Sequence, residues 1–335
     1  MATVGIIANP AAGKDIRRLV AQGRFVPNQE KVNILKRVLA GLDALGVERV
    51  VMMPDMSFLG RGALDNTNFA LTVDFLEMPV FNEELDSTRA AGMMADMEVG
   101  SLITLGGDGT NRAVAKGSRN IPIVPISTGT NNVFPELVEG TIAGLAAGVV
   151  ACGMVSGEDT IMASKRLEIS VDGEMRDIAL VDIAISKELF VGSRAVWNMD
   201  TIDELFLTRA EPTSIGLSAI GAQLRPTYMA DQRGVYIRLG PGEMTVLAPV
   251  APGLITPVEI ADWSTIEYGQ TVPVKLSQCT VALDGERTFS LKSGQVASVC
   301  LTNDGPPVVA IDAALREAAL NGSFHSSFQG RSISK

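Results

Sequence analysis

The chain has 335 residues, of which 46% are hydrophobic and only 20% are charged, and its formal net charge is -10. This length and composition suffice for two domains with buried cores. The acidic excess repels phosphate backbones and anionic lipid headgroups, so neither a nucleic acid nor a membrane surface is expected as a partner. The apolar run 4–8 breaks at Asn9-Pro10 and follows no basic segment, which indicates a strand, not a signal peptide, and a cytoplasmic location.

The histidine and cysteine contents exclude several kinds of catalysis. The single histidine, His325, lies in a polar tail, so a Ser-His-Asp triad, a Cys-His pair, an HExxH zinc site and histidine acid-base chemistry are excluded. The three cysteines lie far apart without a CxxC pair and are expected to be small buried hydrophobes. The chemistry must therefore use carboxylates, hydroxyls, backbone amides, and Lys or Arg, either with or without Mg²⁺.

The first half alternates short β-rich apolar runs with segments of helical period, which predicts a parallel sheet covered by helices. The predicted strands are 4–8, 47–53, 102–105 and 121–126. The predicted helices are 30–45, 90–97 after the capping segment 86–89, and 140–151. These elements predict an α/β nucleotide-binding domain over residues 1–156.

After about residue 157 the pattern changes to short alternating strands separated by Gly and Pro. The strands expected there are 166–171, 178–185, 235–239 and 244–247, and they predict an all-β domain over residues 157–305. Residues 311–320 again have helical character. We therefore expect residues 306–335 to form a helix that returns to the first domain, followed by a mobile tail.

The most informative motif is a strand that leads into a glycine turn and a helix start, Gly106-Gly107-Asp108-Gly109-Thr110. Glycines let backbone amides approach an oxyanion closely, and a helix N-terminus favours negative charge, so this turn suits a phosphate. A carboxylate inside such a turn repels a bare phosphate, so Asp108 needs another task, either holding Mg²⁺ or taking a proton from an acceptor hydroxyl. The alternative is an ordinary turn, in which Asp is common.

A second polar turn follows the next strand and has the sequence Ser127-Thr128-Gly129-Thr130-Asn131-Asn132. Adjacent parallel strands open their turns at one carboxyl edge of the sheet, where ligands of open α/β sheets bind. The two turns therefore predict a cleft for a nucleotide, with Asn9 after the first strand facing the same edge. The segment 8–15 is not a Walker A loop, because Ala8 takes the place of its first glycine and Asp15 that of its Ser or Thr.

In the second half, Asp284-Gly285-Glu286 lies between two β-like runs and indicates a tight turn. One interpretation is a solvated hairpin turn. The other is that the turn reaches the cleft and adds carboxylates to the Mg²⁺ and proton chemistry begun by Asp108. The local pattern leaves both interpretations open.

Together, GGDGT, the following TGTNN and the late DGE make the chain resemble the NAD kinase and diacylglycerol kinase superfamily. Residues 9–19, 127–135 and 282–287 resemble more closely the ATP-NAD kinase-like proteins of the acetoin-catabolism protein X type. The resemblance implies a Rossmann-like α/β domain, an all-β sandwich domain and an active site between them. It also implies a homo-oligomer and phosphoryl transfer from ATP with Mg²⁺ to a small molecule, with NAD(H) the leading acceptor.

The resemblance assigns roles to the motif residues. Asp108, Asp284 and Glu286 would be catalytic, and Asp108 and Asp284 would also hold the metal. The nucleotide would bind Asn9 and the two turns of the first half: Gly106, Gly107, Gly109, Thr110, Thr128, Gly129, Thr130, Asn131 and Asn132.

The acceptor region departs from the resemblance. Typical NAD kinases hold the dinucleotide with an Asn-Glu pair, where this chain has Val181-Asp182, and Val181 can neither donate nor accept a hydrogen bond. Asp182, with Ser214 and Ser218 from a segment that lacks the Tyr of the similar kinases, is the expected substrate-binding set. Three hypotheses remain: an NAD(H) kinase, a kinase for another small hydroxylated metabolite, and a sensor that binds ATP without consuming it. Lipid kinase activity is disfavoured, since no basic amphipathic surface is present.

Overall fold

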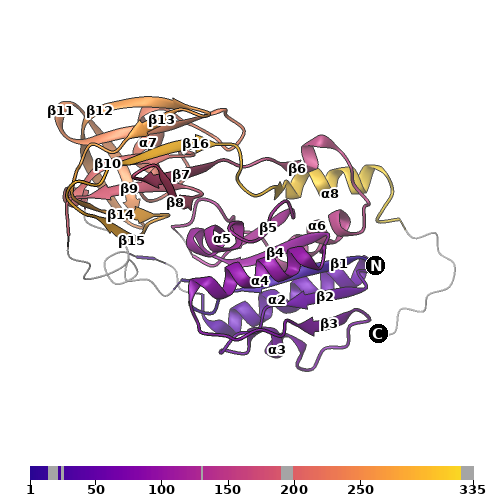
Figure 1. Cartoon of the computed structure of the whole chain (residues 1–335). Coiled ribbons are helices and arrows are strands. Elements are labelled where there is room, and N and C mark those ends of the chain that lie inside the picture. The colour runs from indigo at the N-terminus through magenta and orange to yellow at the C-terminus, as the bar shows by residue number, and fades with distance from the viewer. Residues whose placement is uncertain (14–21, 24–25, 130, 190–198, 326–335) are drawn as a thin grey trace.

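The computed structural model describes residues 1–13, 22–23, 26–129, 131–189 and 199–325. Its N-terminal half is a sheet with helices around it, and its C-terminal half consists mainly of antiparallel strands (Figure 1). The last helix, α8 (Ile311–Leu320), lies against the first half. The predicted combination of an α/β and an all-β half is confirmed.

A seven-stranded sheet of order β3-β2-β1-β4-β5-β17-β6 forms the centre of the first half. Its strands are β1 (Thr3–Ala8), β2 (Arg49–Met52), β3 (Thr72–Phe75), β4 (Ser101–Gly106), β5 (Ile123–Ser127), β6 (Ile161–Met162) and β17 (Val308–Val309). Every pairing from β3 to β17 is parallel, and only the pairing of β17 with β6 is antiparallel. The sheet thus includes short strands from either side of the C-terminal half, and β3 is a strand that the sequence did not predict.

Helices cover both faces of this sheet because successive strand residues point to opposite faces. On one face, α2 (Asn28–Ala44) and α6 (Gly140–Ala151) pack against residues such as Ile6 and Ile103. On the other, α4 (Glu84–Asp96) packs against residues such as Ile7 and Leu102. Every residue of β4 and β5, the two strands that carry the motifs, is buried.

The predicted helix 90–97 was wrong at its start. Helix α4 begins at Glu84, and the segment 86–89, expected to cap it, lies in its first turn. Glu83 is the N-cap, and the Asp86 carboxylate accepts hydrogen bonds from the backbone N–H groups of Phe81 (2.9 Å) and Glu83 (3.2 Å). Glu is not among the residues that usually occupy an N-cap, so the sequence carries no usual capping residue at the true start of α4.

Two antiparallel sheets form the second half, one of order β12-β11-β10-β9-β14-β15 and one of order β13-β16-β7-β8. Their strands are β7 (Arg166–Val171), β8 (Glu174–Ala179), β9 (Asp182–Ser186), β10 (Ile202–Leu207), β11 (Arg233–Ala251), β12 (Leu254–Glu267), β13 (Thr271–Pro273), β14 (Cys279–Leu283), β15 (Glu286–Leu291) and β16 (Ala297–Thr302). Apolar residues of both sheets, among them Ile169, Ile183, Val281 and Val299, share one core, as in a β-sandwich.

The predicted strand 178–185 was also wrong, because it is two strands in different sheets. Strand β8 ends at Ala179, β9 begins at Asp182, and Leu180-Val181 crosses between the sheets. Both crossing residues are buried, so the apolar run continues through the break. Conversely, the two predicted strands 235–239 and 244–247 belong to one long strand, β11, whose register shifts between Leu239 and Met244.

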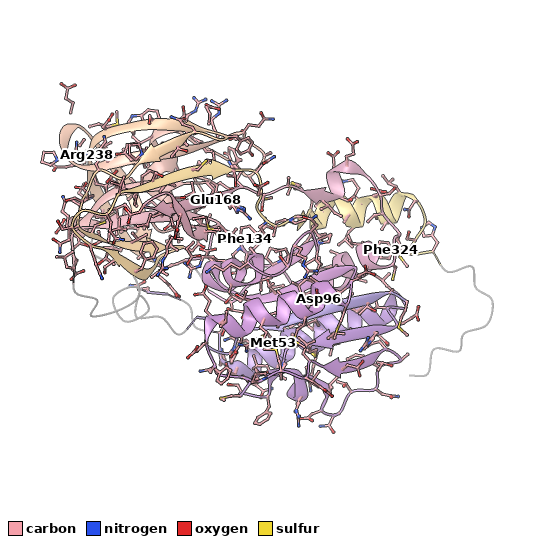
Figure 2. All side chains as sticks on the ribbon, viewed as in Figure 1. Met53, Asp96, Phe134, Glu168, Arg238 and Phe324 are labelled. Carbon is pink, nitrogen blue, oxygen red and sulfur yellow. The ribbon has the colours of Figure 1, made fainter. Side chains whose placement is uncertain are left out.

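The two halves meet around Phe134, which packs with Leu180, Val181 and Val308 (Figure 2). The Arg209 guanidinium lies 5.2 Å from the centre of the Phe134 ring. Helix α8 has the predicted bounds and buries Ala314 and Ala318 in the core under α6. Within the described ranges, every helix is too short or too polar to span a membrane.

Candidate active site

The GGDGT segment joins β4 to α5 (Asp108–Ala115), with Gly107 as the N-cap. A methyl group on Gly106 would lie 2.5 Å from Thr110 Oγ1, and one on Gly107 would lie 2.8 Å from Asn132 Oδ1. The position of Gly106 therefore requires glycine, because Thr110 Cβ would also lie within 2.6 Å, whereas a side chain at Gly107 would displace the Asn132 amide. The predicted strand, turn and helix start are all present, and the turn presents the backbone of a helix N-terminus to the sheet edge.

Asp108 connects this turn to the second polar turn. Its carboxylate accepts hydrogen bonds from the N–H groups of Val133 (3.0 and 3.1 Å) and Phe134 (2.8 Å), and only 8% of the residue is exposed. The N–H of Thr128 donates to the Gly106 carbonyl at 3.1 Å. The structure thus brings the two predicted turns together, and Asp108 is one of the groups that hold them there.

Polar side chains complete this edge of the sheet. Asn9 Nδ2 donates to Thr110 Oγ1 at 2.9 Å, and Asn132 Nδ2 donates to Ser127 Oγ at 2.8 Å. Gly129 N–H donates to the same Ser127 oxygen at 3.3 Å. Asn131 and Gly129 line the same pocket as Asn9, while Thr130 lies outside the described residues.

The Asp284-Gly285-Glu286 segment is a hairpin turn between β14 and β15. Asp284 and Gly285 have φ angles of 51° and 76°, as in the two-residue turns that suit twisted strands. A methyl group on Gly109 would nevertheless lie 3.7 Å from the Glu286 carboxyl group. The segment is therefore a hairpin turn and also lies beside the GGDGT turn, so the two interpretations are compatible.

The Asp284 carboxylate faces the crossing between the two β-sheets. It accepts hydrogen bonds from the N–H groups of Leu180 (3.0 Å), Val181 (2.8 Å) and Asp182 (3.3 Å). Burial raises the pKa of Asp284 to about 6, although the Arg112 charge and these backbone donors act in the opposite direction. The carboxylate is thus desolvated, and its accepted hydrogen bonds compensate part of that cost.

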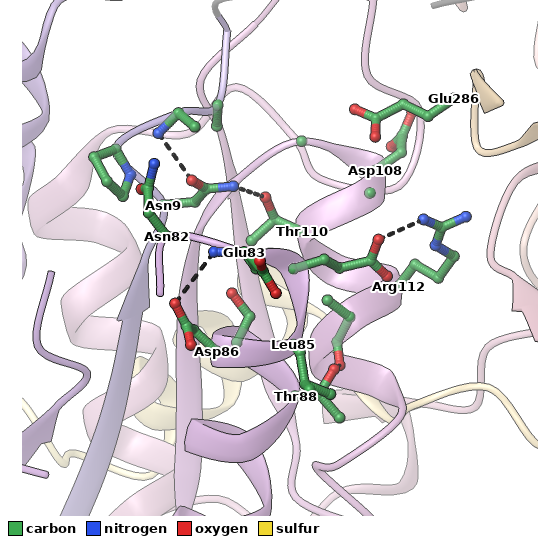
Figure 3. A pocket seen from close by; sticks show the side chains of 18 of the residues that line it. Asn9, Asn82, Glu83, Leu85, Asp86, Thr88, Asp108, Thr110, Arg112 and Glu286 are labelled. Atoms are coloured by element: carbon green, nitrogen blue, oxygen red, sulfur yellow. Dashed lines mark hydrogen bonds and ion pairs between the residues drawn. The ribbon is translucent and has the colours of Figure 1, made fainter. Parts of the chain in front are cut away.

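A pocket of about 870 Å³ lies where these segments meet (Figure 3). It is bounded by the segment after β1, the segment after β2, the start of α4, the GGDGT turn and the β14–β15 turn. Its described lining carries two basic side chains, Arg112 and Lys116, and these acidic ones: Asp55, Glu83, Glu84, Asp86, Asp108, Asp284 and Glu286. A polyanionic ligand needs cations of its own in such a pocket.

The described residues include no group of three or more His, Cys, Asp or Glu that could hold a metal ion. Mg²⁺ seldom needs such a group, because it keeps several waters and binds one or two carboxylates plus the phosphates of a substrate. Glu286 has no side-chain hydrogen bond among the described residues, and Asp108 lies close to it (Figure 3). These donors fit a magnesium ion that arrives with a nucleotide.

The three residues predicted to bind the substrate do not line the described pocket. Asp182 braces the hairpin turn, because its Oδ1 accepts from Gly285 N–H (3.3 Å) and its carbonyl accepts from Asp284 N–H (2.9 Å). Ser218 is fully buried at the start of α7 (Ser218–Leu224), and Ser214 lies in the segment before it. Val181 is also buried and packs in the core with Phe134.

This chain is 41% identical to acetoin catabolism protein X of Cupriavidus necator in an alignment 330 positions long that covers 94% of this chain and 92% of that relative. It belongs to the acetoin catabolism protein X family. Residues 165–304 match the acetoin catabolism protein X C-terminal domain, and residues 4–154 match the ATP-NAD kinase N-terminal domain. The resemblance found in the motifs is thereby confirmed, and the second match supports a phosphotransferase of the kinase type.

Solved structures resemble this member of the acetoin catabolism protein X family in fold. Yeast NADH kinase complexed with NADH matches with a TM-score of 0.52 and 14% identity, over 100% of this chain and 90% of that chain. A putative diacylglycerol kinase from Bacillus anthracis str. Sterne has a TM-score of 0.48 and 13% identity, over 92% and 97%. The first match shows that this chain has a fold like that of the NAD kinases.

Some residues around the pocket had no predicted role. Lys31 is fully buried and its Nζ donates to the carbonyls of Asn9 (3.1 Å), Pro10 (3.0 Å) and Ala12 (2.8 Å), which shapes the segment after β1. Arg112 is equally buried and reaches the second half of the chain. A lysine or arginine on a helix gives no local signal of burial, so only the fold reveals these two.

Proposed function

We propose that this protein transfers the terminal phosphoryl group of ATP to a hydroxyl group of a small molecule, and that NAD(H) is the first acceptor to test. The observation that carries the proposal is the position of Glu286, whose carboxyl group lies 3.7 Å from where a methyl on Gly109 would be, beside a turn suited to phosphate. The match of residues 4–154 to the ATP-NAD kinase N-terminal domain supports the donor.

Glu286 is the best candidate for the group that accepts the proton. It is half-buried, it lines the pocket, and its carboxylate has no hydrogen-bond partner among the described residues. Asp108, by contrast, already accepts two backbone N–H groups. In the proposed step the acceptor oxygen bonds to the terminal phosphorus, its proton passes to Glu286, and the bond to the bridging oxygen breaks so that ADP leaves.

Mg²⁺ would neutralise the charge of the triphosphate in this acidic pocket. Of its two predicted ligands, Asp108 lies beside Glu286 and the phosphate turn, whereas the Asp284 carboxylate faces the amides of residues 180–182. We therefore propose Asp108 as the side chain nearest the metal, which leaves the Glu286 carboxylate to accept the proton. The backbone N–H groups of Gly109 and Thr110, in the first turn of α5, would contact the phosphates directly.

A kinase for another small hydroxylated metabolite is the second candidate. Val181, Asp182, Ser214 and Ser218 occupy the region expected to hold a dinucleotide, and none of them lines the described pocket. The acetoin catabolism protein X relative gives no acceptor in its name. An ATP sensor is the third candidate. For each of the three candidates we expect a homo-oligomer located in the cytoplasm, and sedimentation of the purified protein would test the oligomeric state.

The test is an assay of the purified protein with ATP and Mg²⁺, in which ADP release is followed together with NADP formation and with a panel of small alcohols and hydroxy acids. Glu286→Gln should lower kcat about 10³-fold, since a positioned base contributes roughly 10²- to 10⁴-fold. Glu77→Gln, at an exposed position outside the pocket, is the matched control. An unchanged kcat in Glu286→Gln would refute the role of Glu286, and ATP binding without turnover would favour the sensor.

A further inference from the structure

Arg112 is a buried cation that reaches out of the α5 helix in two directions. Only 1% of the residue is exposed, although it borders the pocket. Its Nη2 donates to Glu84 Oε2 at 2.9 Å, the contact drawn in Figure 3, and its Nη1 donates to the Leu283 carbonyl at 3.2 Å. The side chain therefore joins α5 to the start of α4 and to the end of β14.

The contact to Leu283 is the important one, because Leu283 immediately precedes the Asp284-Gly285-Glu286 turn. Thr288 Oγ1, on the other side of that turn, lies 3.5 Å from the same Nη1. The guanidinium thus lies at the base of the hairpin, with one contact on each strand. Movement of this base would move Glu286 relative to the phosphate turn at Gly109, where the two halves of the chain meet.

Lys116, one helical turn further along α5, repeats the connection. Its Nζ lies 3.2 Å from Glu84 Oε1 and 2.7 Å from Asp177 Oδ1 on β8. The Lys116 side chain is 29% exposed, so this pair is screened by water and is worth less than the buried contact of Arg112. Glu84 is shared by both cations, which fixes the direction in which Arg112 points.

We propose that Arg112 is a positioning residue for the phosphoryl transfer, which holds the β14–β15 turn so that the Glu286 carboxylate stays beside the phosphate turn. The inference rests on the proposed function, because it takes Glu286 as the proton acceptor. Arginine suits the task since its planar fork can donate to a carboxylate and a carbonyl at once, which a lysine ammonium does less well. Both Nη atoms already contact Glu84 and Leu283, whereas the buried Nε has no hydrogen-bond partner among the described residues, so the experiment below also measures whether Arg112 binds the phosphates.

Carboxylates around Arg112 keep it charged in its buried place. Burial alone would lower the pKa of Arg112, but the surrounding carboxylates outweigh it, with Asp284 and Glu84 the strongest, so the pKa is raised. Replacing the arginine would leave these acidic groups without their buried counter-charge. The hairpin base would then lose both a hydrogen-bond donor and an electrostatic attraction to α5.

The experiment compares Arg112→Met and Arg112→Lys with a surface control, Arg119→Met. Arg119 pairs with Asp96 at 2.6 Å, and both side chains are about two-thirds exposed, so this control removes an arginine ion pair that lies outside the pocket lining. Each variant is assayed for kcat and for the KM of ATP, and hydrogen–deuterium exchange is followed for residues 282–288. We expect kcat to fall about 100-fold in Arg112→Met and about tenfold in Arg112→Lys, because small displacements of a reacting group are costly.

In Arg112→Met we expect a lower kcat, an unchanged KM for ATP and faster exchange over residues 282–288. In Arg119→Met we expect kcat, KM and exchange to equal those of the wild type. A raised KM for ATP with normal kcat would make Arg112 a phosphate ligand and overturn the proposal, as would normal kcat with normal exchange. If the wild-type protein turns over no acceptor, the proposed function fails, and faster exchange in Arg112→Met would still show that Arg112 positions the turn. If Arg112→Met does not fold, Glu84→Gln tests the same link, and unchanged kcat and exchange there would overturn it.

Discussion

Two turns meet in the pocket, one from each half of the chain, and both use an aspartate in the same way. Asp108 accepts N–H groups of Val133 and Phe134, which lie beyond the next strand of the parallel sheet. Asp284 accepts N–H groups of Leu180 and Val181, which cross between the β-sheets, and of Asp182, the first residue of β9. In each case a buried carboxylate satisfies backbone donors that have no partner in a strand or helix.

The two turns differ in what they leave free. The first ends in a helix N-terminus, where the backbone N–H groups of Gly109 and Thr110 lie in the first turn and have no acceptor within the helix. The second ends in Glu286, whose carboxylate has no hydrogen-bond partner in the described part of the chain. In the proposed function, one half of the chain therefore binds the phosphates and the other half supplies the base. The two aspartates hold both turns in place.

Alanine substitution of the two aspartates gives the largest expected effect and tests whether they are equivalent. Asp284→Ala should lower the free energy of unfolding by about 4 kcal/mol, because it leaves three buried N–H groups unpaired and removes a charge near Arg112. Asp108→Ala should cost about 2 kcal/mol, since two N–H groups lose a partner. Urea denaturation of both variants measures the difference.

An equal loss of unfolding free energy in the two variants would show that the aspartates contribute equally to stability and would contradict the predicted order. A loss of kcat in Asp108→Ala without any loss of stability would instead give Asp108 a direct role in the chemistry. That result would return Asp108 to the catalytic function predicted from the GGDGT motif, which stays a prediction until then.

The pH dependence of stability gives the next effect, of about 3 kcal/mol. Burial raises the pKa of Asp284 from 3.8 to about 6, so the folded state binds this proton more tightly than the unfolded state. The resulting stabilisation is complete below about pH 4 and is lost as the pH rises through about 6. Asp284→Asn has no such proton, so the wild type should lose stability relative to this variant between about pH 4 and pH 7.

Urea denaturation of both proteins at each pH measures this difference. If the difference in unfolding free energy between the wild type and Asp284→Asn does not change with pH over that range, the accepted hydrogen bonds and Arg112 fully offset the effect of burial on the pKa of Asp284. Asp284 would then be an ordinary ionised carboxylate in the folded protein. The same pH series after substitution of Arg112 by Met would show how much of the opposition to burial the arginine supplies.

Sequence reasoning succeeded where structure is local. Strands β4 and β5 are fully buried runs, and Gly106 and Gly107, at the end of β4, lie close to Thr110 and Asn132, so both turns were visible in the sequence. Helices α6 and α8 and strand β7 have the predicted bounds, because each is delimited by a clear change of pattern. Each of these features depends on neighbours in the chain.

Contacts between distant segments could not be predicted in this way. Arg112 and Leu283 are 171 residues apart, and nothing near Arg112 marks it as the residue that reaches the other half. The apolar pair Leu180-Val181 continues an apolar run while the chain changes sheets, so periodicity could not show the break. The positions of Ser214 and Ser218 depend on how the β-half folds, which the family motif did not define.

A pair of glycine variants sharpens the comparison within the first turn. Gly106→Ala places a methyl group 2.5 Å from Thr110 Oγ1 and should cost about 2 kcal/mol through overpacking. Gly109→Ala places one 3.7 Å from the Glu286 carboxyl group, an ordinary contact, and should leave stability within about 0.5 kcal/mol of the wild type. Thermal unfolding of the two variants tests the packing, and an equal loss in both would contradict it.

The smallest expected effect lies in the second turn and separates its stability from its function. Gly285 has a φ of 76° and Gly153, after α6, has a φ of 65°, so an alanine at either position should cost about 1 kcal/mol of left-handed strain. Only Gly285→Ala should also lower kcat, by about tenfold, because strain there displaces Glu286. Equal losses of stability with normal kcat in both variants would mean that the hairpin tolerates this displacement, and that Arg112 at its base, not the turn itself, determines where the carboxylate lies.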